Sequence, residues 1–391
     1  MTSASMVTGL IVLIVLFALI LRAYSFLSQG DYRQEVNSQL PPDGQGLYES
    51  CAPQDGSRCL DRLKQMAAGG FTLVLNYDQL NGTAEQQLAY AKRAYSLGMR
   101  VIWAMSDPAF WNGTDLISHY SDLAATCNCS DNNGFIRYFV RLVKDLPATW
   151  GYYVGDEVAP GNHAKLKMVT DLVKQTDPHH PRLFVSCSQC DHDANLSYVA
   201  SLIPMVDTTD VVGTDWYPVG SGADSVTDTG KVASAVQSVA DQYGKRSAMV
   251  LQSFTWSEYP SSYHSCSPYP SCVPYPTEAQ MRQMRDLTLQ SSHPRLILWY
   301  SYFDILKSDN PTSHWTDLVA AASAKMSGGS KGTIYKICRS VVYIEGGKTI
   351  IDSGHRQAQQ AIRAIVRQQL ILLAKPQAMC ARGSDSNGTP S

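Results

Sequence analysis

The 391-residue sequence lacks the features that mark several common classes of protein. Its charges nearly balance, at a formal net charge of −2, and no expected helix or strand carries a basic stripe. Because nucleic-acid binding depends on such a stripe, we expect no nucleic-acid partner. The sequence also has no glycine-rich phosphate loop and no nucleophile elbow around Ser253 or Ser301, so hydride and phosphoryl transfer are without support.

Phenylalanine is scarce relative to tyrosine, with 9 Phe against 21 Tyr, and many Tyr and Trp residues stand at expected strand ends. Tyr and Trp combine an apolar ring with a polar tip. This combination suits the binding of sugars, although buried Tyr is also common in protein cores.

Most of the ten cysteines fall in close pairs. A disulfide within each pair is typical of exported proteins. A bridge between Cys127 and Cys129 would be strained, so the alternative for these two cysteines is crossed pairing with another loop. Cys187–Cys190 (CSQC) also resembles half of a zinc motif, but no second pair of ligands completes it. We therefore expect neither a metal nor an organic cofactor. The pairs are Cys51/Cys59, Cys127/Cys129, Cys187/Cys190 and Cys266/Cys272.

A hydrophobic run, Met6–Leu21, lies near the N-terminus. It is short for a membrane span and fits a signal peptide, but extended to Leu27 it would just cross a bilayer. We predict an uncleaved membrane-anchoring helix over residues 1–28, with a signal cleaved near Ala23–Ser25 as the alternative. The protein is then expected outside the cell or at its surface, in contact with the membrane through this helix.

Strand-like and helix-like segments alternate after a polar tether over residues 29–45. Eight strands, each followed by a helical pattern, predict a closed (β/α)8 TIM barrel over residues 46–326. A doubly wound sheet comes second, because it rarely needs eight consecutive units. The expected strands are Gly46–Ser50, Phe71–Tyr77, Arg100–Met105, Trp150–Gly155, Arg182–Ser186, Asp210–Trp216, Ala248–Phe254 and Arg295–Tyr302.

A small appendage is expected over residues 327–391. After a glycine-rich linker, Tyr335–Ile344 and Lys348–Ile351 flank two glycines and predict a hairpin, and His355–Leu373 has the pattern of an amphipathic helix. The appendage is too small to hold a strong core of its own.

The segment Trp150–Val158 (WGYYVGDEV) contains the main candidates for catalysis. Pro160 cannot join a sheet ladder, so the strand ends at Asp156 and Glu157, in the position where (β/α) barrels place their chemistry. Glycosidic hydrolysis needs a proton donor and a second carboxylate. We expect Glu157 to donate the proton, with its proton affinity tuned by the neighbouring charge of Asp156. The alternative is a rim carboxylate that pairs with Arg or caps the next helix.

WGYYVGDE resembles the fourth-strand acid/base segment of clan A glycoside hydrolases, which are retaining (β/α)8 enzymes. Asp210–Val219 (DVVGTDWYPV) resembles the sixth-strand segment of related barrel families, and Val250–Trp256 and Leu298–Asp304 resemble their seventh and eighth strands. The similarity covers roughly Gly46 to Ala324. It implies the barrel fold, sugar hydrolysis and an acid/base role for Glu157.

The chain departs from the best-known members of this clan at two positions. They have Asn where this chain has Asp156, and a nucleophilic Glu at the end of strand seven, where this chain has Gln252. The second carboxylate is therefore open: Asp215 at the end of strand six comes first and Glu258 second, as nucleophile or base. Further options are Glu49 on strand one and Asp304 on strand eight.

The same rim is expected to bind the substrate, with rings stacked on sugar faces and polar groups on hydroxyls. The alternative is that alternate members of this set fill the core. Of the neighbours Trp299 and Tyr300, only one can point inward, because side chains alternate along a strand. The expected binding residues are Glu49, Asn76, Trp103, Asp107, Asp156, Trp216, Tyr217, Gln252, Trp256, Trp299 and Tyr302.

The sequence thus predicts an exported, membrane-anchored glycoside hydrolase that cleaves O-glycosidic bonds of a poly- or oligosaccharide with two carboxylates. A catalytically inactive carbohydrate-binding barrel at the cell surface is the alternative, motivated by Gln252. A third hypothesis, a structural surface protein whose tail recruits a partner, rests on the C-terminal segment alone.

Overall fold

The computed structural model describes residues 40–191, 198–221, 225–259 and 273–323, and the backbone of three strands between residues 333 and 351. The chain divides into two compact units, Met1–Lys325 and Met326–Ser391. The expected anchor over residues 1–28, most of the tether, the glycine-rich linker and the helix over His355–Leu373 lie outside the described residues. No helix in the described part of the chain has the length and apolar character of a membrane span.

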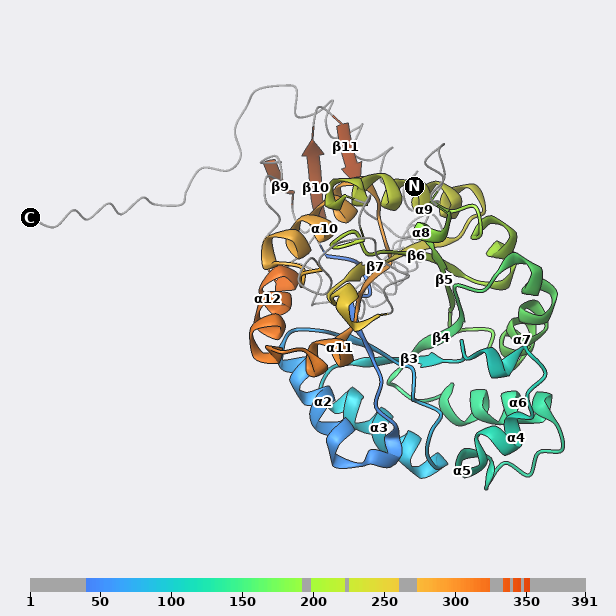
Figure 1. The fold of residues 1–391 in the computed structure, drawn as a ribbon. Coiled ribbons are helices and arrows are strands. Elements are labelled where there is room, and N and C mark those ends of the chain that lie inside the picture. The colour runs from blue at the N-terminus through green and yellow to red at the C-terminus, as the bar shows by residue number, and fades with distance from the viewer. Residues whose placement is uncertain are drawn as a thin grey trace, which may run out of the picture. The chain divides into compact units, whose positions relative to one another are not determined.

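Eight parallel strands form a closed barrel in the first unit, in the order in which they follow one another along the chain (Figure 1). The last strand pairs with the first, with Gly46 opposite Leu298. The predicted TIM barrel is therefore confirmed, and each strand lies within a few residues of its expected range. The strands are β1 (Gln45–Glu49), β2 (Leu73–Asn76), β3 (Arg100–Ala104), β4 (Thr149–Asp156), β5 (Arg182–Cys187), β6 (Val211–Trp216), β7 (Arg246–Gln252) and β8 (Leu296–Tyr300).

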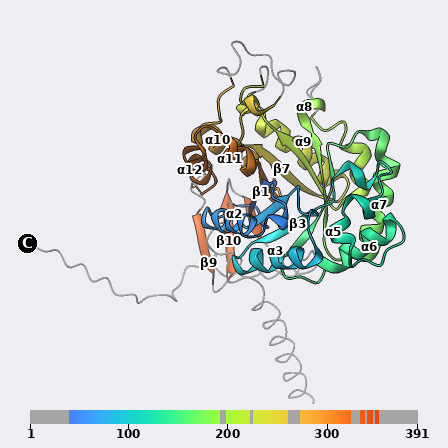
Figure 2. The same cartoon turned by 60° about the horizontal axis from the view of Figure 1, so that its bottom comes forward.

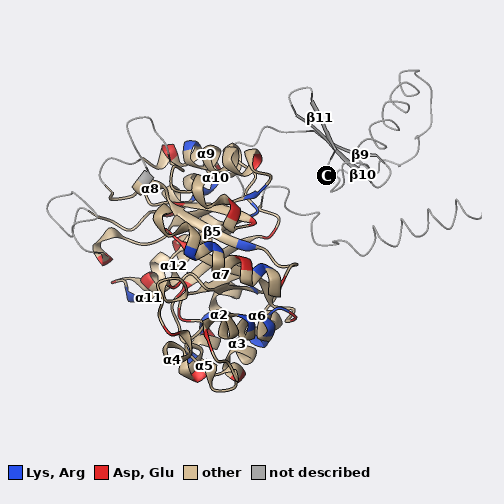
Figure 3. Ribbon diagram, turned by 90° about the vertical axis from the view of Figure 1, so that its right-hand side faces the viewer, with Lys and Arg blue, Asp and Glu red and all other residues tan. Residues whose placement is uncertain are grey.

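The helices lie around the outside of these strands (Figures 1 and 2). Thr83 and Thr277 each cap the helix that follows them with a capping box, because a Gln three residues later bonds back to the cap. Acidic and basic positions are interspersed along the outer helices (Figure 3). The longer helices are α2 (Ser57–Ala68), α3 (Ala84–Ser96), α6 (Asn132–Val143), α7 (His163–Thr176), α9 (Thr229–Gln242), α10 (Glu278–Ser291) and α12 (Pro311–Ser323), and the shorter ones are α4 (Leu116–His119), α5 (Ser121–Ala124), α8 (Ser188–Asp191) and α11 (Tyr302–Lys307).

The barrel strands are buried on both faces, as parallel strands covered by helices must be. Inward side chains such as Leu73, Tyr153 and Leu298 fill the barrel, and outward ones such as Tyr152 and Trp299 pack between the strands and the helices. Side chains therefore alternate between two apolar layers. This alternation decides which aromatic rings reach the barrel interior.

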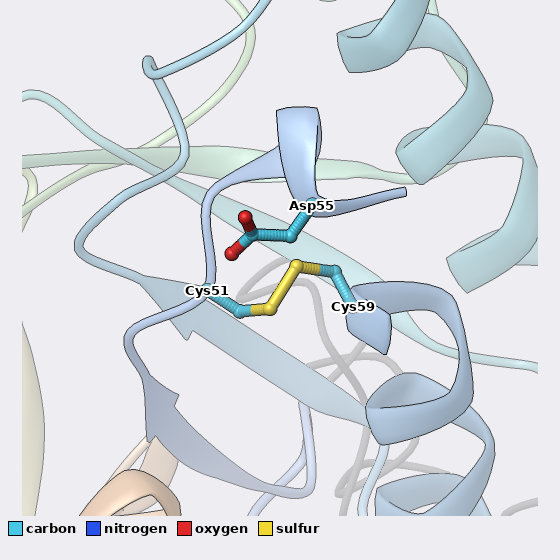
Figure 4. Close-up of side chains that lie close together, drawn as sticks. All are labelled: Cys51, Asp55 and Cys59. Atoms are coloured by element: carbon cyan, nitrogen blue, oxygen red, sulfur yellow. A yellow bond between two sulfur atoms is a disulfide. The ribbon is translucent and has the colours of Figure 1, made fainter. Parts of the chain in front are cut away.

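Three of the expected cysteine pairs form disulfides, and the fourth, Cys266/Cys272, lies outside the described residues. Cys127 pairs directly with Cys129, so crossed pairing does not occur there. Cys51 pairs with Cys59 beside Asp55 (Figure 4), with the sulfurs and a carboxylate oxygen within 4.8 Å of one another. Because these sulfurs are bonded to each other, they are not thiolate ligands for a metal in this state.

The second unit contains a three-stranded antiparallel sheet in the order β11-β10-β9. The strands are β9 (Thr333–Ile337), β10 (Ser340–Glu345) and β11 (Lys348–Ile351). β10 and β11 pair with Glu345 opposite Lys348. The sequence predicted one strand over Tyr335–Ile344, whereas the structure divides this segment between β9 and β10.

Candidate active site

A cavity of 510 Å³ lies at the carboxyl ends of the barrel strands. Its lining residues end or follow β2, β4, β5, β6, β7 and β8, which is the face where TIM barrels carry their chemistry. Three of the side chains described in this lining are carboxylates, and none is Lys, Arg or His. The lining consists of Tyr77, Asp156, Glu157, Cys187, Gln189, Cys190, Asp215, Tyr217, Ser221, Phe254, Trp256, Tyr259 and Tyr300.

The end of β4 brings two adjacent carboxylates into this cavity. Strict alternation would turn one of them away, but Glu157 has a φ of 49°, in the left-handed region that non-glycine residues rarely adopt. The pairing of β4 with β5 shifts register between Tyr153 and Gly155, and the N–H of Glu157 still donates to the carbonyl of Val185 at 2.8 Å. Gly155, two residues earlier, lets β4 pack closely against Phe184 of β5, because a Cβ at this position would lie 2.5 Å from the ring of Phe184.

Asp215 and Glu157 both line this cavity, close enough for the charge of Glu157 to act on Asp215. Asp215, near the end of β6, is only 2% exposed, whereas Glu157 is exposed. Burial, and then the charge of Glu157, raise the pKa of Asp215 well above its usual range. Asp215 therefore keeps its proton to a higher pH than an exposed carboxyl group does.

Asp156 is the third carboxylate of the cavity. It accepts a hydrogen bond from the Tyr77 hydroxyl at 2.6 Å and a second from Tyr153. Burial raises the pKa of Asp156 to about 6, although the two tyrosine hydroxyls act in the opposite direction. The hydroxyl of Tyr48 donates in turn to that of Tyr153 at 3.2 Å, so a tyrosine network holds Asp156 in place.

Aromatic rings at the end of β8 and in the segments that follow β6 and β7 form an apolar wall of the cavity. The ring of Phe254 is at its centre, with centroids 5.1 Å from those of Tyr217, Trp256 and Tyr259. Tyr300 lies 5.6 Å from Tyr217. Such a wall offers flat apolar surface, while the carboxylates and hydroxyls offer polar contacts, a division typical of small-molecule sites.

Five of the residues predicted for the site line this cavity: Glu157, Asp215, Asp156, Tyr217 and Trp256. Glu258, the other candidate for catalysis, is exposed and does not line it. Burial and then the charge of Asp304 raise the pKa of Glu258, but the structure gives it no contact with Glu157 among the described residues.

Four aromatic residues predicted to bind the substrate are instead buried in the outer layer. Trp103 donates its indole N–H to Thr149 at 3.0 Å, and Trp299 donates to Gln45 at 3.0 Å. In β8 it is Tyr300 that faces the cavity, so Trp299, its neighbour, must face the helices. The four residues are Trp103, Trp216, Trp299 and Tyr302.

Glu49, Asn76 and Asp107 also lie outside the cavity lining. Glu49 accepts a hydrogen bond from Arg62 at 2.8 Å, and burial, only partly offset by Arg62, raises the pKa of Glu49 to about 7. Asn76 bonds to the backbone N–H and carbonyl of Cys51. Asp107 caps the short helix that follows it by accepting the N–H of Ala109 at 2.8 Å. All three side chains therefore hold loops in place.

Gln252 is buried, is hydrogen-bonded to backbone groups and does not line the cavity. Its amide nitrogen donates to the carbonyls of Val219 at 2.9 Å and Phe254 at 3.1 Å, and its oxygen accepts the N–H of Val219 at 2.7 Å. The side chain is fully buried. Gln252 therefore ties the end of β7 to the segment after β6 that contains Tyr217.

We expect Gln252→Leu to lower the free energy of unfolding by about 2 kcal/mol, because the buried N–H of Val219 loses its acceptor. Urea denaturation measures this as a lower midpoint with an unchanged slope. The matched control is Gln242→Leu at an exposed position of α9. Equal midpoints for the two variants would contradict a bracing role.

Sequence reasoning missed several residues of the lining, among them Tyr77, Phe254, Tyr259, Gln189 and the Cys187–Cys190 disulfide. For Tyr77 a signal was present, because it follows Asn76 at the end of β2 and so points to the opposite side. The expected seventh strand included Phe254, but β7 ends at Gln252, so strand alternation fixes the direction of neither Phe254 nor Tyr259.

No family model and no curated protein matches the chain. Solved structures match it with low identity. A putative alpha-L-fucosidase from Bacteroides thetaiotaomicron VPI-5482 is 12% identical with a TM-score of 0.49, covering 75% of this chain and 97% of that one. A beta-galactosidase from Marinomonas ef1 is 11% identical with a TM-score of 0.47, covering 71% and 58%. A GH113 beta-1,4-mannanase is 13% identical with a TM-score of 0.44, covering 73% and 99%.

Proposed function

We propose that the chain is a glycoside hydrolase that cleaves O-glycosidic bonds of a poly- or oligosaccharide, with Asp215 and Glu157 as its two catalytic carboxylates. The observation that carries the proposal is that both carboxyl groups line one cavity of 510 Å³ at the carboxyl ends of the barrel strands. Glycosidic cleavage needs one carboxyl group that holds a proton and one that is charged. The wall around Phe254 supplies the apolar surface on which a sugar ring stacks.

The surroundings of the two carboxyl groups decide which one acts as the proton donor. The sequence assigned the proton to Glu157, but Asp215 is the buried member whose pKa is raised, so it is the better proton donor to the leaving oxygen. Glu157 is then the second carboxyl group, which acts at the anomeric carbon. Activity is therefore expected to fall on the alkaline side of the pH profile, where Asp215 loses its proton.

The proposal is tested with the full-length protein and a panel of oligosaccharides and aryl glycosides. We expect release of reducing sugar or aglycone from at least one neutral member of the panel, and none from the same member with Glu157→Gln. Uronides are expected to be poor substrates, because the described lining holds three carboxylates and no cation. Turnover that persists in Glu157→Gln would overturn the assignment.

We expect hydrolysis to retain the anomeric configuration. Carboxyl groups lie about 5–5.5 Å apart in retaining enzymes and about 6.5–9.5 Å apart in inverting ones. Asp215 and Glu157 are close enough for the charge of Glu157 to raise the pKa of Asp215, so the shorter separation of a retaining enzyme fits them better. Proton NMR of the fresh hydrolysate identifies the first anomer formed, and the opposite anomer would exclude Glu157 as the nucleophile.

A binding protein without turnover is the second candidate. It is supported by Gln252, which is found where clan A members place a carboxylate. The side chain of Gln252 is hydrogen-bonded to the backbone of Val219. All three acids of the described lining come from β4 and β6, and none from β7 or β8. This candidate predicts sugar binding by calorimetry with no product after prolonged incubation.

We also propose that the protein acts outside the cell or at its surface, held by its N-terminal hydrophobic segment. The three disulfides support an oxidising compartment. The run Met6–Leu21 supports membrane attachment.

A further inference from the structure

A disulfide forms part of the cavity wall. Cys187 is the last residue of β5, and it is bonded to Cys190 in the short helix α8. Both cysteines line the cavity, and their sulfurs and a carboxylate oxygen of Glu157 lie within 4.8 Å of one another. The bridge encloses only Ser188 and Gln189, so we call residues Cys187–Cys190 the disulfide loop.

The disulfide loop is hydrogen-bonded to the end of β6, where Asp215 lies. Cys187 is directly opposite Asp215 in the register of β5 and β6. The N–H of Ser188 donates to Oδ1 of Asp215 at 3.1 Å, and the Ser188 hydroxyl donates to the backbone carbonyl of Asp215. The side chain of Gln189 donates to the carbonyl of Tyr217 at 3.2 Å. The two residues enclosed by the bridge thus hold both Asp215 and Tyr217.

The contact between Ser188 and Asp215 depends on a fixed turn. Ser188 is fully buried, so its N–H has Asp215 as its partner in a place where water does not substitute readily. The direction of that N–H is set by the backbone between the two sulfurs. Opening the bridge frees this backbone to rotate, and the hydrogen bond to Oδ1 of Asp215 is then no longer imposed.

We propose that the Cys187–Cys190 disulfide positions Asp215 for catalysis, and that reduction of this bridge by a dithiol lowers turnover at the proposed glycoside-cleaving site. A thiolate of the dithiol attacks the sulfur of the exposed Cys190 and releases Cys187 as a thiol after protonation. The second thiol of the reagent then displaces Cys190 and forms a cyclic disulfide. The reagent is oxidised by two electrons and the protein gains two thiols.

The other described disulfides allow a controlled comparison. Cys51 and Cys59 are each only 1% exposed, so a dithiol reaches that bridge poorly under native conditions. Cys127 and Cys129 are half-buried and do not line the cavity, so their bridge is the matched control for a reducible disulfide away from the site. The pair of variants is Cys187→Ser/Cys190→Ser and Cys127→Ser/Cys129→Ser.

The experiment compares steady-state kinetics of the full-length wild type and both variants, with and without dithiothreitol, in a buffer containing EDTA. We expect reduction to lower kcat of the wild type by about 10–100-fold, since misplacement of a catalytic group by about 1 Å costs that much, with a smaller change in KM. Reoxidation should restore the activity. Cys127→Ser/Cys129→Ser should keep this sensitivity, and Cys187→Ser/Cys190→Ser should be slow with or without the reagent.

The pH profile separates positioning from a general loss of structure. The Ser188 N–H lowers the pKa of Asp215, so its loss should move the alkaline limb of kcat/KM to higher pH. An unchanged kcat and pH profile, with Cys187 and Cys190 shown to be free thiols by mass spectrometry, would overturn the proposal.

A separate readout covers the case in which the oxidised protein cleaves no glycan, which would refute the proposed hydrolase. The pH dependence of carbodiimide coupling at Asp215, followed by mass spectrometry, reports the protonation of this carboxyl group without any turnover. Reduction should shift that dependence to higher pH. The absence of a shift would refute the positioning role independently of the activity.

Discussion

Glu157→Gln and Asp215→Asn are each expected to lower kcat/KM by about a thousandfold, the middle of the range for loss of a general acid or base. Gln and Asn keep the size of the side chains they replace but neither carry a carboxylate nor donate an acidic proton. Glu157 is exposed, so its replacement should leave the free energy of unfolding nearly unchanged. Asp215 is buried with a raised pKa, so Asp215→Asn should, if anything, stabilise the protein.

The double variant sharpens this prediction. Because the two carboxyl groups act in the same reaction step, their contributions are not independent, and the double variant should be little slower than either single one. Glu258→Gln is the matched control, since this exposed acid follows β7 but lies outside the cavity lining. Losses that multiply in the double variant, or a Glu258→Gln variant as slow as Glu157→Gln, would count against the pair.

Asp156→Asn is expected to stabilise the protein by at most roughly 3 kcal/mol at pH 7 and by much less at pH 4. The pKa of Asp156 is about 6 in the folded protein, against about 3.9 for an unfolded chain. Between these values the folded state binds more protons, so the stability contributed at this site is lost as the pH rises through this window. Asn cannot ionise, and its carbonyl oxygen can still accept the hydrogen bond from Tyr77.

Urea denaturation of wild type and Asp156→Asn at pH 4 and pH 7 measures this difference. Asp61→Asn, at an exposed position of α2, is the control for a change of charge alone. The same stability difference at both pH values would mean that burial does not raise the pKa of Asp156. A second effect is kinetic, because the charge of Asp156 also raises the pKa of Asp215 and its removal should move the alkaline limb of the pH profile downward.

The eight-strand barrel could be predicted because its signal is local and repeated. Each strand is a short apolar run bounded by turns, and capping residues such as Thr83 and Thr277 mark where helices begin. The position of Asp156 and Glu157 at the end of the fourth strand follows from the same pattern, since all parallel strands of a barrel end at one face. The position of Asp215 at the end of β6 could be predicted in the same way.

The direction of individual side chains was less predictable. Alternation assigns Trp299 and Tyr300 to opposite faces but does not say which one faces inward, because both faces of a parallel barrel strand are buried and apolar. In the structure Tyr300 faces the cavity. Trp103 and Trp216 were placed on the wrong face for the same reason.

The sequence by itself determined the order of strands and helices, and it placed the acidic residues at the carboxyl ends of β4 and β6. Only the tertiary structure decided that Glu157, with its left-handed backbone, lies in the same cavity as Asp215. It also decided that the side chain of Gln252 is hydrogen-bonded to the backbone of Val219. It also decided that the disulfide loop holds Asp215. The physical reason is that element order follows from local periodicity, whereas these contacts join segments far apart in the chain that meet only when the barrel closes.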